Sequence, residues 1–188
     1  GYRDDLRFRP NTEWLDPVVG DTLRTVKHQG TLLLYAPVES PSDFTQGPIG
    51  QVTAEVTQTT GVPPESVAEP SWDIKIADVD GDGREDALIT YVWRDPALED
   101  WMPPVTRVFL FRLDAKEQLV QATLDVGRPL AMGDFDGDGL LDLLGVERPG
   151  FQGLVFHIYR QTGAGSVDRI VSVADEGDTQ NPDHAREK

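Results

Sequence analysis

Two short segments of this sequence concentrate carboxylates at a spacing that suits a hard metal ion. Each has the pattern Asp-x-Asp-Gly-Asp-Gly-x-x-Asp, first at residues 78–86 and again at residues 134–142. So many neighbouring anions repel one another unless a cation lies among them. Calcium accepts many oxygen ligands in flexible geometry, whereas zinc and copper favour the nitrogen and sulfur ligands that both segments lack. The two segments are therefore predicted to be calcium loops.

Four carboxylates and one backbone carbonyl are predicted to bind the metal in each loop. The intervening glycines can adopt positive φ, which lets alternate carboxylates converge on one point. A carbonyl at the seventh position would complete the shell while its side chain stays free to vary. The predicted ligands are Asp78, Asp80, Asp82, Arg84 and Asp86 in the first loop, and Asp134, Asp136, Asp138, Leu140 and Asp142 in the second. Two calcium ions are expected, with a structural role, because closed carboxylate loops leave no reactive position.

An EF-hand loop begins in the same way and is the first alternative. It requires a glutamate at its twelfth position and flanking helices. Here the twelfth positions are Ile89 and Gly145, and both loops run into strand-like sequence. The Gly-Gly-x-Gly-x-Asp repeat of the calcium β-roll is also absent. Both alternatives are therefore rejected.

The two loops belong to a longer internal repeat, because the second loop starts 56 residues after the first (78 to 134). Each copy continues into further strand-like segments, so one repeat holds about four strands, the content of one β-propeller blade. Alternating apolar stretches bounded by turn residues predict the strands. These lie at 31–37, 51–57, 72–77, 87–93, 106–113, 119–124, 128–132, 143–147, 154–160 and 169–173. Residues 11–27 could hold a short helix or an irregular strand.

The expected fold is all-β, with β-propeller blades of four antiparallel strands. Because propellers generally need about four or more blades to close, the chain is expected to be an incomplete propeller, a segment completed by a partner, or an open stack of sheets whose edges are covered in another way. The N-terminus lacks an initiator methionine and a signal-peptide core, which is typical of a processed or excised end. The expected units are an N-terminal segment at 1–30, a half blade at 31–70, calcium-loop blades at 71–125 and 126–175, and a mobile polar tail at 176–188.

These loops resemble the FG-GAP or VCBS-type repeats of integrin α-subunit propellers and of many secreted bacterial proteins. Both loops match the ligand positions of that pattern, and the apolar residues 87–89 and 143–145 match its following strand. The resemblance covers about residues 71–175, while the Phe-Gly and Gly-Ala-Pro elements that name the family are not intact. It implies a calcium-stabilised propeller module for adhesion or recognition in an extracellular or periplasmic location.

The composition agrees with a cation-binding protein and excludes several other classes. The 188 residues carry a formal net charge of −16 and no cysteine. Nucleic-acid and anionic-membrane binding need Lys and Arg, so such partners are not expected. No apolar stretch is long enough to span a bilayer. Without cysteine, disulfide frameworks, zinc-thiolate sites and cysteine nucleophiles are impossible.

Catalytic patterns are scarce, so an enzyme is not expected. No nucleophile elbow, phosphate loop or dinucleotide fingerprint is present. Of the histidines, His157 falls in an alternating strand, His28 lies beside a turn signal, and His184 lies in the polar tail. The paired carboxylates that could cleave a glycoside already belong to the metal loops.

The insertion at 93–104 is the strongest candidate binding loop, because it carries two tryptophans, a methionine and several prolines. Trp93, Trp101 and Met102 could present rigid aromatic and apolar anchors. Alternatively, Trp93 belongs to its strand and Trp101 folds back as a local plug. The leading hypothesis is a non-enzymatic module whose partner is a protein or neighbouring propeller blades. The alternatives are a lectin-like, glycan-binding propeller and an accessory domain of a secreted polysaccharide-acting enzyme.

Overall fold

A computed structural model describes residues 6–15, 22–35, 47–99, 102–147, 153–163 and 166–174. These residues form eleven strands and one short 3-10 helix, and none of them lies in an α-helix. The strands are β1 (Leu6–Leu15), β2 (Arg24–Leu34), β3 (Gly50–Thr60), β4 (Ser71–Ala77), β5 (Asp86–Trp93), β6 (Val105–Leu113), β7 (Leu119–Leu124), β8 (Arg128–Gly133), β9 (Asp142–Glu147), β10 (Val155–Gly163) and β11 (Ser166–Ala174). The 3-10 helix η3 spans Pro64–Ser66.

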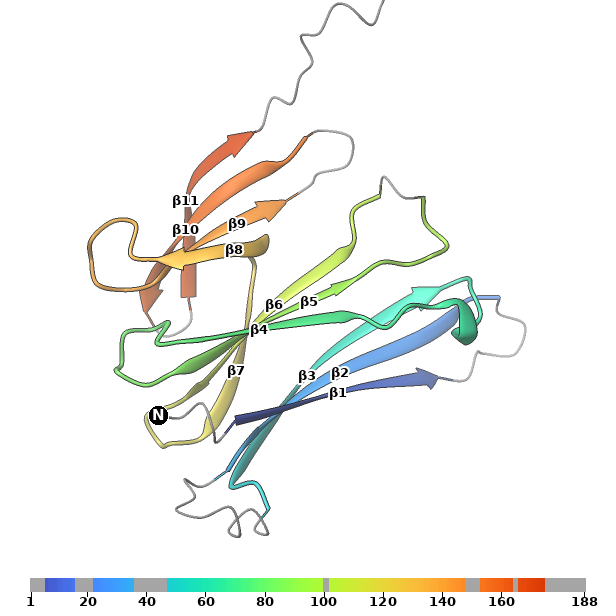
Figure 1. The fold of residues 1–188 in the computed structure, drawn as a ribbon, viewed down its shortest axis with the longest axis horizontal. Coiled ribbons are helices and arrows are strands. Elements are labelled where there is room, and N and C mark those ends of the chain that lie inside the picture. The colour runs from blue at the N-terminus through green and yellow to red at the C-terminus, as the bar shows by residue number, and fades with distance from the viewer. Residues whose placement is uncertain are drawn as a thin grey trace, which may run out of the picture.

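The strands form three antiparallel sheets in which chain neighbours pair with each other (Figure 1). The sheets are β1–β3, β4–β7 and β8–β11, and the β4–β7 sheet lies between the other two. The all-β prediction is confirmed, as is the arrangement of four antiparallel strands within each of the two repeats. Strands β4–β7 fall within 71–125 and β8–β11 within 126–175.

The N-terminal part of the chain differs from the predicted half blade. It forms a sheet of three long strands, and the predicted boundary at residue 30 falls inside β2. Strand β1 pairs with β2 along its whole length, from Leu6 opposite Leu34 to Leu15 opposite Thr25. The reason is the apolar alternation of β1, whose Leu6, Phe8 and Trp14 pack against the core. A short helix within 11–27 is therefore wrong for the described residues of that range.

The middle sheet is buried on both faces, which explains the almost continuous burial of β5. Its Ile89 and Tyr91 pack in a core cluster with residues of the β1–β3 sheet. Leu88 points the opposite way and packs with Leu143 and other residues of the β8–β11 sheet. A strand covered on both faces shows an apolar run rather than clean alternation. The two cores thus hold the three sheets together and fix the loops at their ends.

Within the described residues, the structure contains no helix with the length and hydropathy needed to cross a membrane.

Candidate metal centre

The two Asp-rich loops occupy the same place in their sheets, at the turn between the first and second strands. The first connects β4 to β5, and the second connects β8 to β9. Both turns lie on the same side of the molecule, at the left of Figure 1. The Leu140 side chain of the second loop lies over Gly81 of the first, so closely that a Cβ at position 81 would collide with it. The two candidate sites are therefore direct neighbours.

The backbone of each loop folds around its own carboxylates through matching hydrogen bonds. The first-position carboxylate accepts from the sixth-position glycine, with Gly83 N to Asp78 Oδ2 at 2.9 Å and Gly139 N to Asp134 Oδ2 at 3.0 Å. The ninth-position carboxylate accepts from the second-position amide at 2.9 Å in both loops. The third- and fifth-position carboxylates accept from the amides two residues further on. The sequence repeat is thus also a repeat of local geometry.

Four glycines allow this curled backbone. Gly81 and Gly83 have φ values of 74° and 86°, and Gly137 and Gly139 have values of 84° and 87°. Residues with a Cβ rarely adopt this left-handed region. Positive φ occurs at the glycines for which the sequence predicted it. These glycines therefore allow the curled backbone of the loops.

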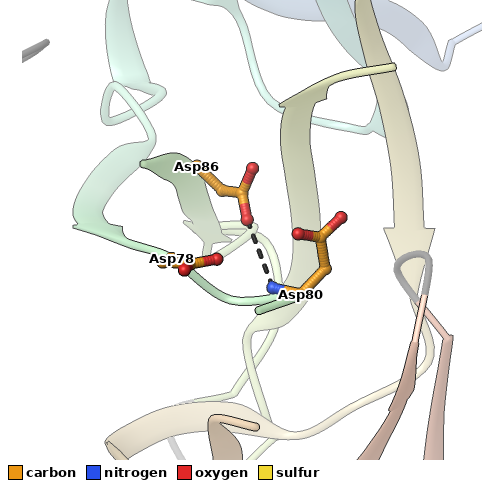
Figure 2. A group of neighbouring side chains, drawn as sticks. All are labelled: Asp78, Asp80 and Asp86. Atoms are coloured by element: carbon orange, nitrogen blue, oxygen red, sulfur yellow. Dashed lines mark hydrogen bonds between the residues drawn. The ribbon is translucent and has the colours of Figure 1, made fainter. Parts of the chain in front are cut away.

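In the first loop, Asp78, Asp80 and Asp86 converge (Figure 2). Each offers a carboxylate oxygen, and these oxygens lie within 4.8 Å of one another. Oδ1 of Asp78 is buried and has no hydrogen-bond partner within the described part of the chain. A buried unpaired carboxylate oxygen is costly unless it has a ligand. The first loop therefore has both a convergent set of candidate ligands and a buried carboxylate oxygen without a hydrogen-bond partner.

Asp86 opens β5 and is the most buried carboxylate of the first loop, with 2% exposure. Burial raises its pKa to about 6, and the nearby Asp80 and Asp82 carboxylates act in the same direction. The backbone amides of Val79 and Asp80 donate to Asp86 and oppose this rise. At neutral pH the loop therefore holds a desolvated negative charge, which a cation would neutralise.

In the second loop, the converging carboxylates are Asp134, Asp136 and Asp138, whose oxygens also lie within 4.8 Å of one another. All three are exposed. Asp142 is fully buried and holds the loop to the sheet. Its carboxylate accepts hydrogen bonds from the amides of Phe135, at 2.9 Å, and Gln161, at 3.1 Å. In the second loop, the three converging carboxylates thus lie at the surface, and the buried Asp142 attaches the loop to the sheet.

The structure brings together three of the four predicted carboxylates in each loop, but not the same three. Asp82 lies outside the first cluster because Arg84 Nε donates to it at 2.9 Å, and this ion pair lowers the pKa of Asp82. Asp142 lies outside the second cluster. Arg84 and Leu140 both occupy the seventh position, where only the backbone carbonyl was predicted as a ligand.

Sequence reasoning missed two arginines beside the loops. Arg112 of β6 lies 3.4 Å from Asp80, and Arg160 of β10 lies 3.9 Å from Asp136, measured from Nη1 to Oδ2. The strand registers make these arginines equivalent, because Phe111 pairs with Ala87 as Tyr159 pairs with Leu143. The signal in the sequence is an aromatic residue followed by Arg in the third strand of each repeat. Each arginine offsets part of the loop's negative charge.

The predicted binding loop is only partly described. Trp93 is 3% exposed, and its indole Nε1 donates to the carbonyl of Ala68, so it belongs to the core as the packing alternative proposed. Trp101 lies outside the described residues. Met102 is partly buried, and its backbone amide donates to Glu99. Trp93 is therefore removed from the candidate binding residues.

Two histidines take structural places inside the sheets. His28 is fully buried, its Nδ1 lies 2.6 Å from the Tyr91 hydroxyl, and burial lowers its pKa. His157 lies in β10, as predicted, with Nδ1 2.8 Å from the hydroxyl of Ser172 on β11. These contacts link neighbouring elements. His184 lies outside the described residues.

A cavity of about 420 Å³ lies at the strand ends opposite the Asp loops. The end of the insertion, Pro103 and Pro104, forms part of its wall. The polar part of the wall carries two basic and two acidic side chains, namely Arg107, Arg128, Asp125 and Glu147. Such a mixed wall suits a polar ligand or a polar protein segment.

Comparison with family models, with curated proteins and with solved structures gives no match to this chain.

Proposed function

We propose that this chain is a calcium-binding β-sheet module of the FG-GAP or VCBS type, with a non-enzymatic role in recognition or assembly. The observation that carries the proposal is the convergence of three carboxylates in each of two equivalent loops, with oxygens within 4.8 Å. Magnesium demands a tight octahedron and keeps its waters, so flexible loops rich in aspartate favour calcium. The buried, unpaired Oδ1 of Asp78 supports the same conclusion.

The role of the metal is structural in this proposal. Each loop joins two strands of its sheet, and the buried Asp86 and Asp142 belong to both the loop and the second strand. A cation that draws the loop together also fixes the start of that strand, so metal binding contributes to folding. Calcium-dependent stability suits an extracellular or periplasmic module, which is the location that the family resemblance implies.

The recognition role is supported by the cavity beside the insertion, whereas Trp93 lies in the core and Trp101 stays a predicted anchor. Its wall combines proline with side chains of both charges, which can hold a segment of a partner protein. The alternatives of glycan binding and of an accessory role beside a polysaccharide-acting enzyme would use the same cavity. A glycan array separates them from protein recognition.

Single substitutions in the two loops test the metal proposal. Asp80→Asn and Asp136→Asn each remove one carboxylate charge from a different cluster. In calorimetric titration with calcium, each variant is expected to lose or weaken one of two binding events and to keep the other. Asp73→Asn, an exposed position on β4, is the matched control and should bind as the unmodified chain does. Equal binding by all four proteins would contradict the proposed ligands.

Calcium binding to the first loop is expected to weaken as the pH falls below about 6. The folded-state pKa of Asp86 is raised from 3.8 to about 6, so below that value a proton occupies the carboxylate that calcium requires. For one competing proton, the apparent Kd should rise about tenfold for each further pH unit. In the metal-free chain the pH dependence of stability has the opposite sign. The free energy of unfolding should rise as the pH falls from about 6 towards 3.8, because protonation removes the buried charge of Asp86. Calorimetry of Asp136→Asn, in which the first loop is intact, measures the effect. A constant Kd between pH 7 and pH 5 would contradict it.

A further inference from the structure

The two outer faces of the three-sheet stack have opposite character. On the β1–β3 sheet, Lys27 lies 3.0 Å from Glu13 and 3.7 Å from Glu55 on the face turned away from the core. Thr31 and Thr53 pair through their hydroxyls on the same face, at 2.8 Å. This end of the stack therefore has a polar surface that can remain exposed to solvent.

The outer face of the β8–β11 sheet is mostly apolar at its centre. Leu143 of β9 points into the core, so its neighbour Leu144 points outward, and the strand registers extend this outward face across the sheet. Two rows of apolar side chains cross three of its strands, β9 to β11, namely Leu144–Ile158–Val171 and Val146–Phe156–Val173. On the fourth strand, β8, Arg128 lies opposite Val146. Val171 and Val173 are 42% and 58% exposed, and the other four residues of these rows are partly buried. Contiguous apolar surface of this kind marks an interaction site.

The internal repeat shows what covers such a face. The repeat makes Leu144 equivalent to Leu88, and the registers make Ile158 equivalent to Leu110. Leu88 and Leu110 are buried, because the next sheet of the stack packs on them. The outer face of β8–β11 is thus equivalent, through the repeat, to the face of β4–β7 that packs against the β8–β11 sheet. Its natural cover is the apolar face of another sheet.

This chain carries such a face only once among its described residues. The opposite end of the stack is charged, so a head-to-tail copy would bury Lys27, Glu13 and Glu55 against valine and phenylalanine. The same face of a second copy is an apolar match for it, and a two-fold axis can bring the two faces together. Arg160 lies opposite Asp168 across β10 and β11, so this part of the sheet carries both signs of charge.

We propose that two copies of this chain associate through the outer faces of their β8–β11 sheets, in a symmetric dimer. Association buries the two apolar rows of each copy and leaves the polar β1–β3 faces at the two ends. Because both outward-facing ends are then polar, assembly stops at two copies. The proposal does not depend on calcium binding, since the rows are formed by strands rather than by loops.

Sedimentation equilibrium of the full chain at near-physiological salt tests the dimer. The unmodified chain is expected to show a concentration-dependent monomer–dimer equilibrium. Val173→Lys places a charge in the interface of each copy and should weaken association at least about tenfold. Thr59→Lys is the matched control, because it adds the same side chain at an exposed strand position of the polar sheet, and it should leave association unchanged.

Circular dichroism and thermal unfolding of the monomers show that both variants fold, which is expected because Val173 and Thr59 are already exposed. A chain that stays monomeric at all concentrations would overturn the proposal. Equal weakening by the two substitutions, or open-ended growth beyond two copies, would overturn it as well. The measurement is repeated in calcium and in chelator, and a Val173-dependent dimer in either condition supports it.

Discussion

Calcium is expected to raise the unfolding temperature of this chain substantially, and a chelator to reverse the rise. A ligand at a hundredfold excess over its Kd stabilises the folded state by about 2.7 kcal/mol per site, so two independent sites give about 5 kcal/mol. For a chain of this length that corresponds to a shift of about 10–20 °C. The physical reason is the repulsion among converging carboxylates, together with the desolvated charge of Asp86, both of which a cation relieves.

Differential scanning calorimetry with and without calcium measures this shift, and the loop variants supply the control. The double variant Asp80→Asn/Asp136→Asn loses one charge in each cluster and is expected to fold, so most of the shift should disappear. Magnesium at the same concentration should give a smaller shift, because it retains its waters. An unfolding temperature that is the same in calcium and in chelator would contradict the metal account.

Truncation of Leu110 to alanine is expected to lower the free energy of unfolding by about 2–5 kcal/mol. Leu110 lies at the centre of β6, is fully buried, and packs in the core cluster that joins the β4–β7 and β8–β11 sheets. The loss combines the transfer free energy of the removed methyl and methylene groups with the cavity left between two sheets. Denaturant unfolding, monitored by tryptophan fluorescence, measures the change.

Leu98→Ala makes the same chemical change outside the core and serves as the control. Leu98 is exposed in the insertion after β5, so its truncation should change stability by no more than about 0.5 kcal/mol. Similar losses for the two variants would mean that the β8–β11 sheet does not pack on the middle sheet in solution.

The sequence predicted the parts of this structure that depend on local pattern. The repeat of Asp and Gly at fixed spacing located both loops and the positive φ at their glycines. Short apolar stretches, alternating or continuous and bounded by turn residues, located β4 and the strands that follow it. Each signal is carried by residues only a few positions apart in the sequence, so neither depends on contacts between distant segments.

The remaining features depend on contacts between distant segments. Strand β1 was missed because Pro10 and several charged residues obscure its alternation, and only its pairing with β2 shows that it belongs to a sheet. Trp93 looked available to a ligand because its burial depends on packing against the β1–β3 sheet, which is distant in the sequence. Arg112 and Arg160 reach their loops from strands far along the sequence. The different choice of converging acids in the two loops likewise depends on the ion pair of Asp82 with Arg84 and on the anchoring of Asp142 to Gln161.

The number of calcium ions retained per chain shows directly whether the two Asp-rich loops bind metal. After equilibrium dialysis against calcium followed by a brief metal-free wash, elemental analysis together with native mass spectrometry gives the ratio of calcium to protein. Two calcium ions are expected per unmodified chain, one for Asp80→Asn, one for Asp136→Asn and none for the double variant. A chain that retains no calcium, or that retains two ions in all four proteins, would contradict this expectation.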